Sequence, residues 1–322
     1  MKMGSRVAVT GCAGFIGSHL VDALLDKGAE VVGLDNFSSG SMNNIEGARE
    51  NGNFDLIEGD ILCEEDLDEL MTDVEIVYHL AANPDVRVGV ADTQTHLNQN
   101  IIGTYNVLET MRRKSVGMIS FTSTSTIYGE ALEIPTPEDY GPLKPISLYG
   151  ASKLSCEALI SSYCHVFDFR SLIFRFANVV GSRSGHGVIH DFISKLEKDP
   201  NKLEILGSPP GTLKSYCSVQ DCIEGMLAAE KNCIEKVGIY NIGSNDTLDV
   251  QSIANIVAEG MGLGKVKHSW TGGVDGGRGW VGDVKQMQLS LTKIMSEGWK
   301  PRMSSAEAVR VAAKDLLSEK RG

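Results

Sequence analysis

The segment "VAVTGCAGFIGSHLVDALL" (residues 7–25) constrains the fold of this chain more than any other part of it. It joins an apolar strand to an amphipathic helix through Gly11, Gly14 and Gly17. Glycines at such a junction permit a tight turn and let the backbone approach a pyrophosphate, which then lies at the helix N-terminus. The segment therefore predicts the first strand–turn–helix of a dinucleotide-binding domain.

An acidic residue stands where that prediction needs one. Asp35 follows Gly17 by eighteen residues and ends the apolar run "EVVGLD" (30–35). A carboxylate at the end of the second strand binds the ribose hydroxyls of NAD and repels the 2′-phosphate of NADP. We therefore expect NAD as the cofactor, and Asp35 argues against an NADP-dependent reductase.

Short apolar strands alternate with amphipathic helices through the first half of the chain. The strands are expected at 6–10, 30–34, 54–58, 75–80, 118–123 and 170–176, and the helices at 15–27, 64–71, 96–113 and 149–167. This alternation predicts an α/β fold with a Rossmann-type, doubly wound parallel sheet. We expect an NAD-binding domain at 1–177, to which 215–240 returns, and a smaller C-terminal α/β substrate lobe at 178–322 that ends in a helix near 304–318.

The charge balance and the cysteines exclude several classes of function. Lys and Arg number 30 against 42 Asp and Glu, and a net charge of −12 does not favour binding to nucleic acid. No apolar run reaches the roughly 18 residues of a membrane span, and the first strand begins too early for a signal peptide. The seven cysteines form no C-x-x-C pair, and His186 and His190 lack a third ligand. We expect a cytoplasmic protein with reduced thiols, no metal and no membrane partner.

A tyrosine and a lysine, Tyr149 and Lys153, are four residues apart at the start of the helix predicted in "SLYGASKLSCEALI" (147–160). Residues at this spacing share one helical face, so the ammonium group can meet the phenol. A neighbouring cation favours the phenolate, whose unperturbed pKa is about 10. The pair is therefore a candidate general base.

The G-x-x-G-x-x-G spacing, together with Tyr-x-x-x-Lys, resembles the short-chain dehydrogenase/reductase superfamily. Four further motifs resemble its extended branch, the nucleotide-sugar epimerases and dehydratases: "GDI" (59–61), "HLAAN" (79–83), "NIIGT" (100–104) and "YNIGS" (240–244). The resemblance implies that NAD is contacted by Gly11, Gly14, Phe15, Ile16, Gly17, Asp35, Asn36, Asp60, Ile61, Leu80, Ala81, Ala82, Asn100, Thr122, Tyr149, Lys153 and Phe176.

The stretch "FTSTSTIYG" (121–129) bears on the reaction. Thr124 matches the hydroxyl residue that this branch keeps beside the catalytic tyrosine, and in dehydratases an Asp-Glu pair follows it. Here Ser125 and Thr126 follow, and neither can act as a carboxylate base. The chain thus most resembles the UDP-glucose 4-epimerases. The resemblance implies that Tyr149 is the base, that Lys153 holds the nicotinamide ribose, and that Thr124 relays the proton.

The same resemblance implies a UDP-sugar substrate and a homodimer formed through helices 96–113 and 149–167. The implied substrate contacts are Thr124, Asn178, Val188, Ile189, Lys214 and Arg278. The chain departs from the usual pattern at two places, because Lys214 and Ser215 replace an Arg-Asp pair and Arg278 lies five residues before Asp283 instead of within R-x-G-D. Lysine lacks the two-pronged fork of arginine, so the base and the hexose stay open.

Two alternatives remain. The substrate can be UDP-glucuronate or a UDP-N-acetylhexosamine, and Arg87 in "NPDVRVG" is a candidate partner for a sugar carboxylate. A non-catalytic NAD-binding sensor belongs to a different class, because this fold hosts many functions. A sensor has no need of the combination of Tyr149, Lys153 and Thr124.

Overall fold

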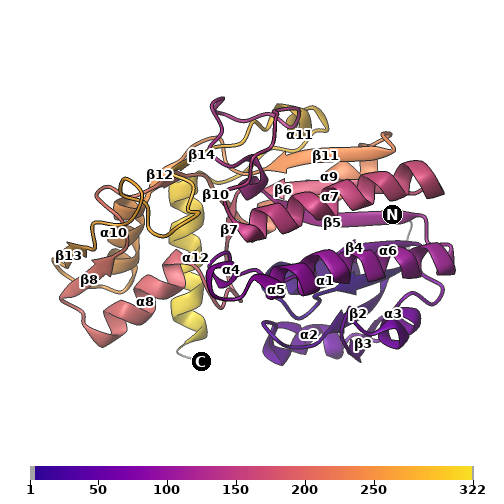
Figure 1. Ribbon diagram of the computed structural model, residues 1–322. Helices are drawn as coiled ribbons and strands as arrows, with labels where there is room; N and C mark the ends of the chain where they lie inside the picture. The colour runs from indigo at the N-terminus through magenta and orange to yellow at the C-terminus, as the bar shows by residue number, and fades with distance from the viewer. Residues whose placement is uncertain (1–3, 321–322) are drawn as a thin grey trace. The chain divides into compact units, whose positions relative to one another are not determined.

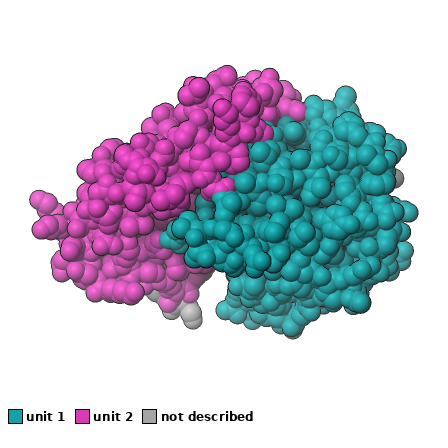
Figure 2. Space-filling view, viewed as in Figure 1, with its two compact units in different colours: residues 1–127, 148–175, 226–240 teal, residues 128–147, 176–225, 241–322 magenta. Residues whose placement is uncertain are grey.

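The computed structural model describes residues 4–320, which form two compact units (Figure 2). The first unit contains the chain up to Ile127 together with Leu148–Arg175 and Met226–Tyr240. The second contains Tyr128–Ser147, Phe176–Gly225 and the chain from Asn241 onward.

The first unit is built on a seven-stranded sheet of order β11-β6-β5-β4-β1-β2-β3 (Figure 1). Its strands are β1 (Arg6–Thr10), β2 (Glu30–Asp35), β3 (Phe54–Glu58), β4 (Ile76–His79), β5 (Met118–Thr124), β6 (Arg170–Phe176) and β11 (Val237–Ile242). β1 pairs in parallel with both β2 and β4, so the strand order reverses between β1 and β4. Open α/β sheets bind ligands at the carboxyl ends of the strands beside such a reversal. The predicted Rossmann-type fold is confirmed.

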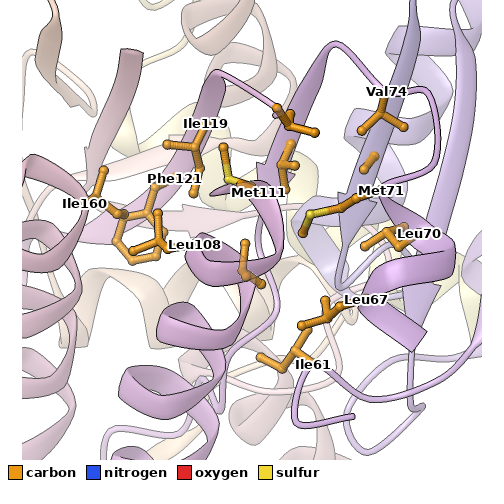
Figure 3. Packing of buried hydrophobic residues seen from close by; sticks show 14 of the residues in the cluster. Ile61, Leu67, Leu70, Met71, Val74, Leu108, Met111, Ile119, Phe121 and Ile160 are labelled. Atoms are coloured by element: carbon orange, nitrogen blue, oxygen red, sulfur yellow. The ribbon is translucent and has the colours of Figure 1, made fainter. Parts of the chain in front are cut away.

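Helices bury the apolar faces of this sheet. The helices of the first unit are α1 (Phe15–Asp26), α2 (Glu46–Arg49), α3 (Glu64–Leu70), α4 (Val88–Ala91), α5 (Thr93–His96), α6 (Gly103–Lys114), α7 (Leu148–Phe167) and, in part, α9 (Val219–Asn232), with the short helices η1 (Met42–Ile45), η2 (Leu97–Ile102) and η3 (Ser125–Tyr128) near the strand ends. Figure 3 shows Leu70 of α3, Met111 of α6 and Ile160 of α7 in one apolar cluster with Ile119 and Phe121 of β5. The strands are nearly continuous apolar runs because the sheet is buried on both faces.

The helix predicted at 96–113 is wrong as a single α-helix. The structure divides it into α5, a π-helical segment (η2) and α6. A π turn inserts an extra residue into the helix and often marks a functional site. Here it turns the Asn100 side chain inward, where the residue is 1% exposed. The predicted apolar stripe also divides, because Leu108 and Met111 are buried whereas Leu97 and Tyr105 are 47% and 45% exposed.

The second unit has its own core. Its elements are β7 (Asn178–Val180), α8 (Val188–Lys198), β8 (Lys202–Ile205), β9 (Leu213–Lys214), β10 (Tyr216–Ser218), β12 (Leu248–Asp249), α10 (Val250–Gly260), β13 (Lys267–Trp270), β14 (Gln286–Met287), α11 (Thr292–Ser296) and α12 (Ser305–Glu319). α8, α10 and α12 pack together and bury Ile193, Ile253 and Val309. Ser304 and Glu307 form a capping box that fixes the start of α12.

The observed units differ from the predicted boundaries in three segments, the shortest of which, 176–177, belongs to the second unit instead of the first. Residues 128–147 belong to the second unit, where the Tyr128 hydroxyl donates to Asn241 Oδ1 at 2.8 Å and the Thr136 N–H donates to the Gln288 carbonyl at 2.9 Å. Of the stretch 215–240, only Met226–Tyr240 belongs to the first unit.

Among residues 4–320, no helix is long and apolar enough to cross a membrane.

Candidate active site

The glycine loop is packed too closely for side chains. Gly11 has φ +72°, and a Cβ atom there would lie 2.8 Å from the Ala81 nitrogen. A Cβ atom at Gly17 would lie 2.0 Å from the Gly11 carbonyl oxygen. α1 starts directly after Gly14, its N-cap residue. The N–H groups in the first turn of the helix therefore lie next to glycines, whose backbone a ligand can approach closely. Such a cradle fits a pyrophosphate.

Asp35 at the end of β2 is connected to this loop. Its carboxylate is 7% exposed and accepts hydrogen bonds from the Ala13 N–H at 2.9 Å and the Phe37 N–H at 2.8 Å. A carboxylate has about four acceptor positions, so two remain for ribose hydroxyls. At the neighbouring strand end, Asn36 Nδ2 donates to Asp60 Oδ2 at 2.8 Å. The residues present therefore fit NAD.

The turn 80–82 is held by a buried histidine that sequence reasoning did not single out. Thr10 Oγ1 accepts the Leu80 and Ala81 N–H groups at 3.2 Å, so its own proton goes to His79 Nδ1 at 2.8 Å. His79 Nε2 then donates to Thr104 Oγ1 at 3.0 Å. Burial, and secondarily the charge of Lys153, lower the pKa of His79 to about 3. A neutral imidazole thus joins β1, β4 and α6 behind the glycine loop.

Asn100 links the same region to α7. Its Oδ1 accepts the Asn83 N–H at 2.9 Å and its Nδ2 donates to Ser152 Oγ at 2.9 Å. Ser152 Oγ in turn donates to the Tyr149 carbonyl at 2.8 Å. The buried amide therefore fixes the first turn of α7, which carries the candidate base.

Lys153 is buried, with an exposed fraction of 3%. Its Nζ donates to the Thr122 carbonyl at 2.9 Å and lies 4.6 Å from the centre of the Phe121 ring. Burial lowers its pKa to about 8, while Cys156 and Glu157 act in the opposite direction. The predicted lysine is thus anchored to the end of β5, two residues before Thr124.

Tyr149 lies one helical turn before Lys153 and packs edge-on against His96, with ring centres 5.6 Å apart. Burial raises the pKa of the Tyr149 phenol above its ordinary value, with a smaller contribution from Cys156. In the protein alone, burial therefore keeps the pKa of the Tyr149 phenol above its ordinary value although Lys153 lies on the next helical turn.

Hydroxyl groups crowd the end of β5. The Thr126 N–H donates to Thr124 Oγ1 at 3.2 Å, and the two threonine oxygens are also 3.2 Å apart. Ser125 lies between them and is 8% exposed. Because Thr124 Oγ1 accepts the backbone proton, its own proton is free to go to Thr126 or to a ligand.

Lys214 and Arg278, two of the residues predicted in the second unit, meet at Asp283. Lys214 Nζ lies 2.6 Å from Asp283 Oδ1 and 5.5 Å from the centre of the Trp280 ring. Arg278 Nη1 donates to the Asp283 carbonyl at 2.6 Å and also pairs with the Glu130 carboxylate. The loop after Arg278 folds back, so the unusual spacing still brings both cations to Asp283, Lys214 to its carboxylate and Arg278 to its backbone carbonyl.

The other predicted residues of this unit occupy different environments. Asn178 Nδ2 donates to the Ser215 carbonyl at 3.3 Å, and Ser215 Oγ accepts the N–H of Ser244 in the "YNIGS" motif at 2.9 Å. Ile189 is a core residue at 4% exposure, and Val188 packs at the edge of that core. Phe176 is buried at 5% exposure.

Sequence reasoning missed Ser123, Glu157 and Arg175, which form a buried cluster beside Lys153. A signal was present for one of them, because Glu157 follows Lys153 by four residues and therefore shares its helical face. Ser123 and Arg175 lie on separate strands, and only the fold brings them to Glu157.

Known proteins resemble this chain over nearly its full length. A putative UDP-glucose 4-epimerase of Methanocaldococcus jannaschii is 33% identical over 312 residues, which cover 94% of this chain and 96% of the relative. A solved UDP-galactose 4-epimerase is 43% identical, with a TM-score of 0.86 and coverage of 98% and 99%. A UDP-glucuronic acid 4-epimerase of Bacillus cereus, solved with UDP-glucuronic acid and NAD, is 29% identical, with a TM-score of 0.88 and coverage of 98% and 99%.

The model of the NAD dependent epimerase/dehydratase family matches residues 7–243 of this chain. The matched region includes the glycine loop, Asp35, Thr124, Tyr149 and Lys153. The chain belongs to the NAD dependent epimerase/dehydratase family.

Proposed function

We propose that this chain inverts C4 of a UDP-hexose, interconverting UDP-glucose and UDP-galactose through a transient 4-keto sugar. The observation that carries the proposal is the set of groups at the end of β5 and the start of α7. Tyr149, Lys153 and Thr124 supply proton transfer, and Ser125 and Thr126 supply only hydroxyls next to Thr124. Elimination of water or loss of carbon dioxide needs an acid–base group beside C5 or C6, whereas oxidation and reduction at C4 do not.

Each residue has one role in this reaction. Tyr149, as phenolate, removes the proton from the sugar 4-hydroxyl and later returns it. Thr124 hydrogen-bonds the same oxygen, and its free proton relays between sugar and phenol. Lys153 holds the nicotinamide ribose and stabilises the phenolate by its charge. NAD held there would supply the acceptor and donor of the C4 hydride, and the positive charge of its nicotinamide would add to that of Lys153 in favouring the Tyr149 phenolate.

NAD itself is proposed to lie on the loop that Gly11, Gly14 and Gly17 form, with Phe15 and Ile16 opening α1. Asp35 and Asn36 would hold its ribose, and Asp60 and Ile61 would hold its adenine. Leu80, Ala81, Ala82, Asn100, Thr122 and Phe176 complete the contacts. The close-packed glycines and the two free acceptor positions of Asp35 support this assignment.

The second unit is proposed to hold the nucleotide. Lys214 and Arg278 provide positive charge for the diphosphate, and Asn178 provides an amide. Val188 contacts the nucleotide from the first turn of α8, and Ile189 acts through its backbone because its side chain is buried. Lysine is a point charge without the fork of arginine, so this arrangement grips the diphosphate less rigidly than two arginines would.

UDP-glucuronate is the second candidate substrate, because the similar Bacillus cereus enzyme was solved with it. In this chain Arg87 Nε lies 3.3 Å from Asp85 Oδ1, and a sugar carboxylate would have to compete with that aspartate.

Deuterium at C4 of UDP-galactose tests the reaction class. We expect UDP-glucose that retains the label in ordinary water, with neither a stable keto sugar nor net NADH, because one hydride leaves and returns. The measurement is NMR of the product. Loss of the C4 deuterium to solvent, or accumulation of a 6-deoxy-4-keto sugar, would contradict the proposal. If only UDP-glucuronate or a UDP-N-acetylhexosamine inverts with its label retained, the mechanism stands and the sugar assignment changes.

We further propose a cytoplasmic homodimer. All seven cysteines are free thiols, as expected in a reducing compartment. Leu97 and Ile102 of η2, Tyr105 at the start of α6 and Phe167 at the end of α7 are each more than 40% exposed. An apolar surface of this kind on two adjacent helices fits a second copy of the same two helices.

Tyr105→Glu is expected to convert the dimer to a monomer, because it places a charge in the proposed interface. Ile234→Glu is the matched control, since Ile234 is 94% exposed and lies outside these helices. Sedimentation equilibrium measures both masses. A wild-type protein with the mass of one chain contradicts the dimer.

A further inference from the structure

A fully buried ion pair lies one helical turn beyond Lys153. Arg175 on β6 binds Glu157 on α7 through Nη2 at 2.8 Å and through Nε at 3.2 and 3.3 Å to the two carboxylate oxygens. The two side chains are 4% and 6% exposed. Burying two charges is costly, and such a pair is weak as a source of stability alone. The pair therefore calls for an explanation other than stability.

The third member of the cluster lies on the strand that ends in the catalytic threonine. Ser123 Oγ donates to Glu157 Oε1 at 2.5 Å. The preceding residue of β5, Thr122, accepts the Lys153 ammonium proton through its carbonyl oxygen. Two successive residues of β5 are thus bound to two successive turns of α7, and the next residue is Thr124.

The charges around Lys153 come from several elements. His79 on β4 is neutral, His96 on α5 has its pKa lowered by burial, and Cys156 on α7 has its pKa raised by burial. The Tyr149 phenol lies on the preceding turn of α7. Glu157 is the buried carboxylate that favours the charged form of Lys153, and Arg175 partly neutralises it.

We propose that Glu157, Arg175 and Ser123 are positioning residues of the epimerase reaction, which hold Thr124 in register with Tyr149 and set the charge state of Lys153. The cluster contacts neither sugar nor cofactor in this role and acts through the residues it holds. The inference rests on the proposed function for its kinetic part, whereas its electrostatic part concerns the protein without substrate.

Opposite substitutions in the pair test the electrostatic part. Glu157→Gln removes the negative charge and leaves Arg175, so the pKa of Lys153 is expected to fall by about one unit or more. Arg175→Met leaves Glu157 uncompensated, so the same pKa is expected to rise. The readout is the ¹³Cε shift of labelled lysine in the protein without added NAD, titrated with pH and assigned with Lys153→Met. If the pKa of Lys153 moves in the same direction in both variants, or in neither, the assignment is overturned. Damage to the packing alone would not shift this pKa in opposite directions in the two variants.

The kinetic readout follows the same logic. The alkaline limb of the kcat profile should move to lower pH in Glu157→Gln and to higher pH in Arg175→Met. Asp168→Asn is the matched control, since Asp168 pairs with Lys236 at 2.6 Å on the surface of the same unit and should shift neither the limb nor the titration. If the wild type inverts C4 but the alkaline limb of the kcat profile lies at the same pH in both variants as in the wild type, this inference is contradicted. If the wild type does not invert C4, the proposed function is contradicted.

Ser123→Ala tests the positioning part without changing any charge. We expect kcat to fall about tenfold, with the KM for UDP-galactose and the titration of Lys153 unchanged, because a small displacement of Thr124 affects the reacting geometry. An unchanged kcat would remove Ser123 from the set. If either single charge variant fails to fold, the double variant Glu157→Gln/Arg175→Met replaces it. Because this variant has lost both charges, the pKa of its Lys153 should lie within about half a unit of the wild-type value, and a larger shift contradicts the inference.

Discussion

Replacing Tyr149 by phenylalanine is expected to lower the turnover of UDP-galactose at least a hundredfold while NAD still binds. Positioned acid–base groups contribute about 10²–10⁴ to a rate, and the substitution removes the only atom of the side chain that can carry a proton. The ring itself stays, so its edge-on contact with His96 and the Asn100–Ser152 bonds that fix this turn of α7 are preserved.

Tyr163→Phe is the matched control, because it makes the same chemical change on the same helix. The Tyr163 hydroxyl donates to Glu109 Oε1 at 2.5 Å, remote from Lys153 along α7. Steady-state turnover and NAD affinity are measured for both variants, the latter by fluorescence titration. Near wild-type turnover in Tyr149→Phe would remove Tyr149 from the role of base, and lost NAD affinity would mean that the change acts through the cofactor.

Much of the first unit can be predicted from sequence because its signals are local. Apolar runs such as "RVAVT" and "RSLIFRF" need only burial on both faces to become strands, and the glycine loop needs only its own backbone geometry. The division of the predicted helix 96–113 is different. In the structure, Asn100 at this division forms hydrogen bonds with Ser152 and with the Asn83 N–H. Both partners are distant from Asn100 in sequence, so no local pattern predicts these bonds.

The site shows the same distinction. Tyr149, Lys153 and Thr124 are recognisable because spacing and neighbouring motifs mark them. The raised pKa of Tyr149 could not be predicted from the spacing to Lys153, because desolvation depends on everything packed around the phenol. The chain of Thr10, His79 and Thr104 was also out of reach, since its three members come from two strands and a helix.

Gly17→Ala is expected to lower NAD affinity by about a hundredfold or more, because even a methyl group cannot be accommodated there. A Cβ atom at Gly17 would lie 2.0 Å from the oxygen and 2.9 Å from the carbon of the Gly11 carbonyl. Both are backbone atoms and cannot rotate away as a side chain could. The loop must open, which displaces the start of α1 from the position where its N–H groups meet the pyrophosphate.

Gly47→Ala is the control, because Gly47 lies in α2 of the same unit and a Cβ atom there would have no neighbour within 4 Å. It should leave NAD affinity unchanged and leave the melting temperature unchanged or slightly higher, since alanine favours a helix. NAD titration and thermal melts by circular dichroism separate the two effects for both variants. Overpacking costs about 1–3 kcal/mol, so Gly17→Ala should still be folded at room temperature. A folded Gly17→Ala that binds NAD as tightly as wild type would show that the pyrophosphate does not lie on this loop, and the assignment of Asp35 to the ribose would fall with it.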